Sequence, residues 1–254
     1  VVNQSGYPEL DPYRLALTQV FVTELAESPN VRVLPYARLL QILRRFIATG
    51  TDVSSRETFQ AITVHGASRF VVLPTLIYEN GRWSARAEIQ DASTATRVAV
   101  VATESVASAI VPETALRLIG ELASGLQAHF KTNGPGKSYA LRAVAARPRS
   151  LEAAKLFEEG LSAFEELEYS AAEQSLAQAM EKDSRNPIPI AWLSRVQQIL
   201  RKTDQASETA ETAFRLLAGN TPRLDALFVN AVVAEARRDF TSAEASYRQV
   251  VRLY

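Results

Sequence analysis

One pattern occurs three times in the C-terminal part of this 254-residue chain, as Tyr169-Ser-Ala-Ala172-Glu, Thr203-Asp-Gln-Ala206-Ser and Phe240-Thr-Ser-Ala243-Glu. The alanines of successive copies are 34 and 37 residues apart. A period in this range indicates an array of supersecondary units, each of which buries its apolar face against the next. We therefore predict repeated helical hairpins and expect each copy of the pattern to open the second helix of one hairpin.

The residues around the first copy fit two helices packed closely together. Leu156 and Gly160 mark the first helix, and Ala172, Leu176 and Ala179 mark the second. Small residues fall where two helices must approach, and large ones fall where the hairpin needs filling. This arrangement resembles the tetratricopeptide repeat family. The resemblance implies an all-α array of about three units, at residues 153–186, 187–223 and 224–254.

Residues 1–66 alternate between helical and extended patterns. We predict a helix over residues 12–27, a strand over residues 31–34 and a second helix from Leu39 to Gly50. A capping-box spacing between Ser54 and Glu57 predicts a third helix that runs to about Gly66.

Residues 70–130 predict three successive strands and a long helix. The strands are expected at residues 70–77, 83–90 and 97–105, and Asn80-Gly81 is the signal for a type I′ hairpin turn. A helix that starts at Pro112 should bury one apolar face, made of Ala115, Leu118, Ile119, Leu122 and Leu126. The predicted fold class is therefore an α+β domain at residues 1–130, a mixed sheet with helices packed on it, followed by the all-α array.

The order of several short motifs in this N-terminal part resembles the N-terminal domain of TolB and its relatives. The motifs are Asn3-Gln-Ser5-Gly6 with Glu9-Leu-Asp11, Val31-Arg-Val-Leu34, Gly66-Ala-Ser-Arg-Phe70-Val-Val and Ile89-Gln-Asp91-Ala-Ser-Thr. The resemblance implies that Val1-Val2 ends the first strand of the domain. The chain departs from the family pattern at Ala95, where relatives usually place glycine in the turn.

Composition excludes several classes of function. The 28 basic and 28 acidic residues balance, and no basic cluster suits the neutralisation of nucleic-acid phosphates. The chain has no cysteine, which rules out disulfides, thiolate metal sites and cysteine nucleophiles. It has no apolar run long enough to span a membrane. Because it starts without Met and stops within a helical pattern at Tyr254, we expect it to be a piece of a longer protein with further repeats.

No motif predicts catalysis, a cofactor or a metal. Gly136-Lys137-Ser138 resembles the end of a phosphate-binding loop, but Lys131 stands where such a loop needs its first glycine, and no strand precedes it. We interpret residues 131–150 as a linker between the domains. His65 and His129 have no ligand or acidic partner at metal-site spacing.

The first helices of the repeats supply the candidate binding site. The positions that the repeat frame directs to the concave face are Phe157, Leu161, Phe164, Arg195, Gln198, Phe228, Val232 and Glu235. Such a groove suits an extended or helical peptide, with aromatic anchors and Arg195 paired with a carboxylate or amide. The alternative is structural, in which Phe157 and Phe228 pack against each other or against the N-terminal domain.

The pairing of the two domain types resembles the sensory or C-terminal region of bacterial membrane-anchored serine/threonine kinases, adenylate cyclases and transcription regulators. That resemblance implies a non-catalytic interaction and sensing module outside the cytoplasm, whose partner is a protein or peptide and not a nucleic acid. Any membrane helix would lie in a segment outside residues 1–254. The alternative is a structural or assembly component of a bacterial envelope complex, in which the α/β domain makes the protein contact and the repeats hold a homo-oligomer together.

Overall fold

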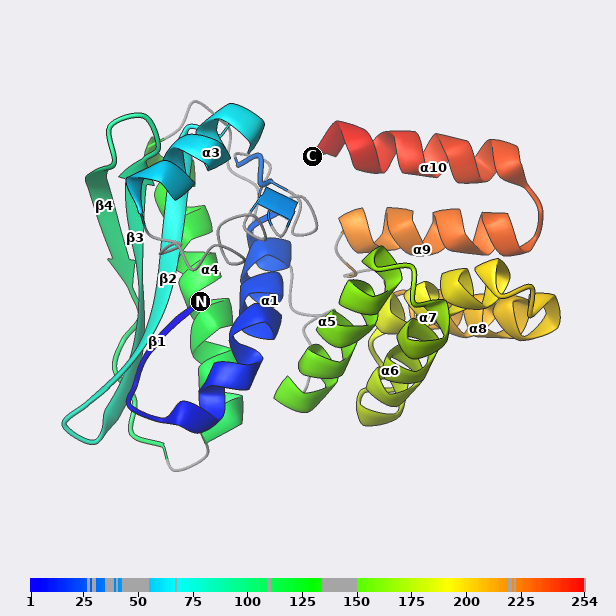
Figure 1. The fold of residues 1–254 in the computed structure, drawn as a ribbon, viewed down its shortest axis with the longest axis horizontal. Coiled ribbons are helices and arrows are strands. Elements are labelled where there is room, and N and C mark those ends of the chain that lie inside the picture. The colour runs from blue at the N-terminus through cyan, green and yellow to red at the C-terminus, as the bar shows by residue number, and fades with distance from the viewer. Residues whose placement is uncertain are drawn as a thin grey trace. The chain divides into compact units, whose positions relative to one another are not determined.

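The computed structural model describes residues 1–26, 28, 31–34, 39, 41–42, 55–66, 68–108, 111–133, 150–218, 221 and 223–253. The chain divides into two compact units, Val1–Ser138 and Tyr139–Tyr254 (Figure 1). The first unit combines a mixed sheet with helices, and the described part of the second is helical, as predicted. The division falls within the predicted linker, of which residues 134–149 lie outside the described residues.

The described residues of the first unit form a four-stranded sheet in the order β1-β2-β3-β4. Its strands are β1 (Val2–Gln4), β2 (Phe70–Glu79), β3 (Arg82–Asp91) and β4 (Thr96–Ala102). Strand β1 is parallel to β2, whereas β2, β3 and β4 form an antiparallel meander. The three consecutive strands predicted from the sequence are confirmed, and β1 makes the sheet mixed.

Left-handed residues make both hairpin turns of the meander. Asn80 and Gly81 have φ of 53° and 74°, as a type I′ turn requires. Ala95 has a φ of 56°. Its turn is held by Asp91, whose Oδ1 accepts the backbone N–H of Ser93 at 2.9 Å. This hydrogen bond helps to hold Ala95 in the left-handed conformation, which is energetically unfavourable for a residue with a Cβ.

Helices α1 (Arg14–Ala26) and α4 (Val111–Asn133) pack against each other, and α4 contacts β2, β3 and β4 (Figure 1). The five residues predicted to face inward from α4 are all buried. On β3 the buried side chains alternate with more exposed ones, so that one face of the strand points into the core. The buried residues are Trp83, Ala85, Ala87 and Ile89.

Two predictions at the start of the chain need correction, and a third falls largely on residues that the structure does not describe. Residues 31–34 are not a strand, because they pair with no strand of the sheet among the described residues; Val33 packs on Val22 of α1 instead. A 3-10 helix, η1 (Pro8–Tyr13), precedes α1, so Pro12 lies before the α-helix rather than at its first position. The predicted helix over residues 39–50 lies mostly outside the described residues.

Helix α3 (Arg56–Gly66) begins one residue later than its predicted cap implied. The Ser55 hydroxyl accepts the backbone N–H of Thr58 at 3.2 Å, which is the hydrogen bond of an N-cap. Ser54, the predicted cap, lies outside the described residues. Both serines satisfy the composition of a cap, so the sequence pattern alone did not separate them.

The described residues of the second unit form three helical hairpins. They are α5 (Leu151–Glu165) with α6 (Tyr169–Lys182), α7 (Pro187–Ile199) with α8 (Thr203–Arg215), and α9 (Arg223–Ala236) with α10 (Phe240–Leu253). Helix α6 packs on α7, α8 on α9, and α7 also on α9. The three copies of the sequence pattern open α6, α8 and α10, as predicted.

The turn inside each hairpin has the same backbone conformation. Leu167, Arg201 and Arg238 stand at equivalent positions and have φ of 64°, 61° and 61°. The next residue in each turn donates its N–H to a carbonyl five residues earlier, at 2.9 Å in all three hairpins. This is a Schellman ending, which a left-handed residue completes. The repeat is therefore present in the backbone as well as in the sequence.

Close approach of the two helices is achieved differently in each hairpin. A Cβ at Gly160 would lie 2.7 Å from Cγ of Leu176, so only glycine leaves room for this leucine. At the position equivalent to Gly160, α7 has Ser194, which is fully buried and donates its hydroxyl to the carbonyl of Ala206 at 2.7 Å. The equivalent residue of α9 is Ala231, also fully buried.

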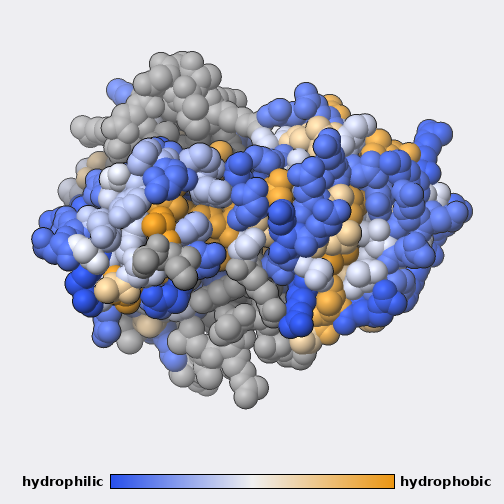
Figure 2. All heavy atoms as spheres, turned by 90° about the horizontal axis from the view of Figure 1, so that it is seen from below, coloured by the Kyte–Doolittle hydropathy of each residue, from blue (hydrophilic) through white to orange (hydrophobic). Residues whose placement is uncertain are grey.

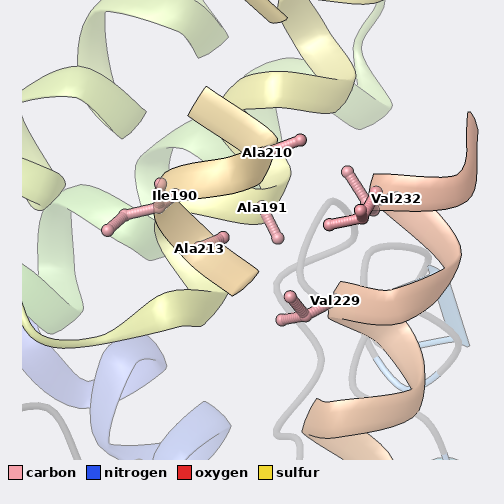
Figure 3. Packing of buried hydrophobic residues seen from close by; sticks show 7 residues of the cluster. Ile190, Ala191, Ala210, Ala213, Val229 and Val232 are labelled. Carbon is pink, nitrogen blue, oxygen red and sulfur yellow. The ribbon is translucent and has the colours of Figure 1, made fainter. Parts of the chain in front are cut away.

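A shared core joins the second and third hairpins. It lies between α7, α8 and α9, where small residues of α7 and α8 face valines of α9 (Figure 3). Its buried members are Ile190, Ala191, Ala210, Ala213, Val229, Val232 and Val233. This packing fixes the relative position of α7 and α9, the two helices that carry most of the candidate binding site.

Candidate partner-binding site

Three aromatic side chains, one from each first helix, form a row across the hairpins. The ring centroid of Trp192 on α7 lies 5.1 Å from that of Phe164 on α5 and 5.1 Å from that of Phe228 on α9. All three side chains are half-buried. We call Phe164, Trp192 and Phe228 the aromatic row. Because half-buried aromatic residues supply large apolar contact area with little loss of side-chain entropy, such a row suits the anchoring of a partner.

Arg195 lies beside the aromatic row. The carbon of its guanidinium group is 5.4 Å from the ring centroid of Trp192, 5.9 Å from that of Phe164 and 5.5 Å from that of Tyr247 on α10. Rings at these distances attract the cation through their π faces. Arg195 forms no hydrogen bond or ion pair with any residue that the structure describes. The rings thus hold the guanidinium in place while its N–H groups stay available to an acceptor.

Gln198, one helical turn after Arg195, carries a second donor that no described residue uses. Its Nε2 is buried and has no hydrogen-bond partner among the described residues. A buried amide nitrogen without a partner is costly, by about 1–3 kcal/mol. The two side chains lie on α7 three residues apart, a spacing that places them on the same face of the helix.

Tyr247 and Glu235 close the other side of the cluster. The Tyr247 hydroxyl donates to Oε2 of Glu235 at 2.9 Å. Burial raises the pKa of Tyr247 above its ordinary value, the Glu235 carboxylate raises it further, and the Arg195 cation opposes them. Tyr247 therefore stays protonated and keeps one oxygen of Glu235 engaged. The carboxylate does not pair with Arg195 within ion-pair distance.

The structure brings together five of the predicted site residues: Phe164, Arg195, Gln198, Phe228 and Glu235. Phe157 is half-buried and packs against the buried core of α6 and α7, a place that neither the groove nor the structural alternative gave it. Leu161 is half-buried. The prediction for Val232 is wrong, because its side chain is fully buried in the core between α7, α8 and α9 (Figure 3).

Two residues of the cluster were missed by the sequence analysis. Trp192 was not among the positions that the repeat frame directs to the concave face, and the structure shows that its equivalents, Glu158 and Val229, are both buried. Tyr247 belongs to a second helix, whereas only first helices were considered. Its bulk was a usable signal, because the equivalent positions hold Leu176 and Ala210, and a longer side chain there reaches past its own hairpin.

The surface offers no sign of a metal centre among the described residues, in which no group of three or more His, Asp or Glu side chains is placed to hold an ion. Within the same residues, no helix combines the length and apolarity needed to cross a membrane. The face seen in Figure 2 shows hydrophobic residues scattered among hydrophilic ones.

The fold and the site together define a class of protein: an α+β unit followed by repeated helical hairpins that present aromatic rings and unpaired donors. Comparison of the chain with known protein families, with characterised proteins and with solved structures finds no match.

Proposed function

We propose that this chain is a non-catalytic interaction and sensing module that binds a protein or peptide partner through the first helices of its hairpin array. The cluster of Arg195, Gln198 and the aromatic row carries this proposal. Rings offer apolar contact, and the two polar side chains offer donors that the described residues do not use. A peptide that combines an apolar side chain with a carboxylate or carbonyl oxygen supplies both kinds of contact.

The cellular setting of the proposal rests on resemblance. The repeat pattern is similar to tetratricopeptide repeats and the N-terminal motifs are similar to those of TolB relatives, a pairing found in the sensory regions of bacterial membrane-anchored signalling proteins. We propose an extracytoplasmic location for the module on that basis. The second candidate is a structural component of an envelope assembly. It is favoured by the outer edge of β4, which no described residue pairs with.

The test begins with selection of peptides from a randomised 12-residue library on the immobilised full-length chain. We expect the selected peptides to be enriched in acidic residues or a free carboxyl end next to an apolar residue. Binding is then measured by fluorescence of Trp192 in a Trp83→Phe chain. Trp83 and Trp192 are the two tryptophans of the sequence, so this substitution leaves the signal of the site alone.

Arg195→Gln is expected to weaken binding of the selected peptides about ten- to hundredfold, which corresponds to loss of a charged hydrogen bond of about 1.5–3 kcal/mol. Arg185→Gln is the matched control, because Arg185 is exposed in the loop between α6 and α7. The proposal fails if no peptide family is selected, or if Arg195→Gln binds the selected peptides as tightly as Arg185→Gln does.

A further inference from the structure

Strand β4 is the last strand of the sheet that the described residues form, and none of these residues pairs with its outer edge (Figure 1). It pairs with β3 on one side, and no described residue forms a hydrogen bond with it on the other. At the opposite end of the sheet, β1 is only three residues long, whereas β4 has seven. An exposed edge of this length is a template for pairing with another chain unless the sequence protects it.

The hydrogen bonds around β3 show which backbone groups of β4 face the free edge. Thr103, just after β4, donates its N–H to the carbonyl of Ala85 at 2.9 Å, which places the backbone groups of Ala85 on the β4 side. Backbone groups alternate between the two sides of a strand. Ala87 therefore also directs its backbone groups to β4, and its partner Val101 directs its own to β3. The neighbours of Val101 in the strand, Val100 and Ala102, direct their N–H groups away from β3, to the free edge.

The side chains of β4 do not protect its edge. Val98 and Val100 have exposed fractions of 57% and 47%, whereas Val101 lies against Gly125 of α4. Native edges are commonly blocked by a charge or a proline. Among residues 96–102 the only charge is that of Arg97, and the sequence has no proline there.

The single charge of the strand is already balanced within its own sheet. Nη1 of Arg97 lies 3.9 Å from Oε1 of Glu88 on β3. A partner strand with acidic side chains would compete with Glu88 for the Arg97 guanidinium. A partner strand with basic side chains would be repelled by Arg97. A second β4 avoids both effects in an antiparallel arrangement, because a two-fold axis near the middle of the strand places Arg97 of each copy opposite the apolar end of the other.

We propose that two copies of this chain pair through β4 in antiparallel orientation, so that the two sheets become one across a two-fold axis. The N–H groups of Val100 and Ala102 then donate to the other copy. The exposed valines of one strand pack beside those of the other. The contact area of one strand pair is small, so the dimer is weak and concentration-dependent. This inference is independent of the peptide-binding proposal.

Val100→Pro tests the pairing directly. Proline removes an N–H that points to the free edge and leaves the bonds between β4 and β3 intact, since proline is tolerated at such an edge position. Val100→Thr is the matched control, because threonine is β-branched and keeps the N–H. Sedimentation equilibrium of the full chain, at concentrations up to about 1 mM, reports the mass.

The expected result is a shift of the wild type and of Val100→Thr from the 27.9 kDa monomer towards twice that mass, while Val100→Pro stays monomeric with an unchanged circular dichroism spectrum. A wild type that stays monomeric throughout overturns the proposal. So does a folded Val100→Pro chain that dimerises like the wild type.

A second measurement uses the absence of cysteine from the chain, and it stays informative if Val100→Pro fails to fold. Single Val100→Cys and Ala102→Cys chains are oxidised at the concentration where the wild type dimerises. Glu79→Cys, at the exposed end of β2, is the control. Disulfide-linked dimers are expected for at least one β4 variant, and not for Glu79→Cys. Equal cross-linking of all three variants, or none, contradicts pairing through β4.

Discussion

Gly160 is expected to be irreplaceable in the wild-type chain and replaceable once Leu176 is shortened. An alanine Cβ at residue 160 would lie 2.7 Å from Cγ and 2.9 Å from Cδ2 of Leu176. Leu176 is fully buried among Ala172, Leu193 and Val196, so it has no space into which to turn. Overpacking of this kind costs about 1–3 kcal/mol.

Helix propensity acts in the opposite direction. Replacing an interior glycine by alanine stabilises a helix by about 1 kcal/mol. Two contacts under 3.0 Å place the clash in the upper part of that range, about 2–3 kcal/mol, so Gly160→Ala should lower the free energy of unfolding by about 1–2 kcal/mol. In a Leu176→Ala background the clash disappears and the sign reverses, with a gain of up to about 1 kcal/mol. Ser194 and Ala210, the equivalent pair of the second hairpin, are already small at both positions.

The assay is urea unfolding followed by Trp192 fluorescence in Trp83→Phe chains, which reports the hairpin array alone. With a denaturant slope of about 2 kcal/mol/M, Gly160→Ala should lower the midpoint by about 0.5–1 M. The same substitution beside Leu176→Ala should leave the midpoint unchanged or raise it. Two results would refute the clash between Gly160 and Leu176. One is a midpoint that Gly160→Ala raises while Leu176 is intact, and the other is a midpoint that Gly160→Ala lowers equally with Leu176 and with Leu176→Ala.

Three further outcomes follow from single contacts. The raised pKa of Tyr247 implies stabilisation that is present below about pH 10 and is lost as the pH rises, so the wild-type melting temperature should fall more steeply above pH 10 than that of Tyr247→Phe. Hydrogen bonds from the Ser93 hydroxyl and N–H lower the pKa of Asp91, so its contribution is present above about pH 4 and lost as acid is added; Asp91→Asn should flatten the acid limb of a stability–pH curve. Trp83 is fully buried beside Tyr7 and Tyr78, and Trp83→Ala should cost about 3–5 kcal/mol in urea unfolding of the first unit.

Local patterns predicted the elements of the fold where one strong signal dominated. The 34- and 37-residue spacings located three hairpins because each alanine must sit at a close helix crossing, and all three alanines are buried. Asn80-Gly81 located a turn because both residues tolerate positive φ. The strand prediction for residues 31–34 failed because their alternation is equally compatible with a strand and with a loop whose valine packs on α1, and nothing within these four residues decides between them.

The candidate site was predicted less completely than the fold. A repeat frame identifies equivalent positions, but exposure depends on what the neighbouring helix places there. Leu161, Arg195 and Val232 are equivalent, yet Leu161 is half-buried, Arg195 is surrounded by rings and Val232 lies in the core. Because α7 packs directly on α9, the residue of α9 is covered, and no pattern within a single repeat contains that information.

That same comparison explains why Arg195 carries the functional proposal. The positions equivalent to it hold apolar leucine and valine, so packing of the array does not require a charge there. A guanidinium held among three rings, without a hydrogen bond to any described residue, loses part of its hydration and gains only ring contacts in return. The repeat departs here from its own apolar pattern with a side chain that its stability does not need, and we propose recognition of a partner as the physical reason.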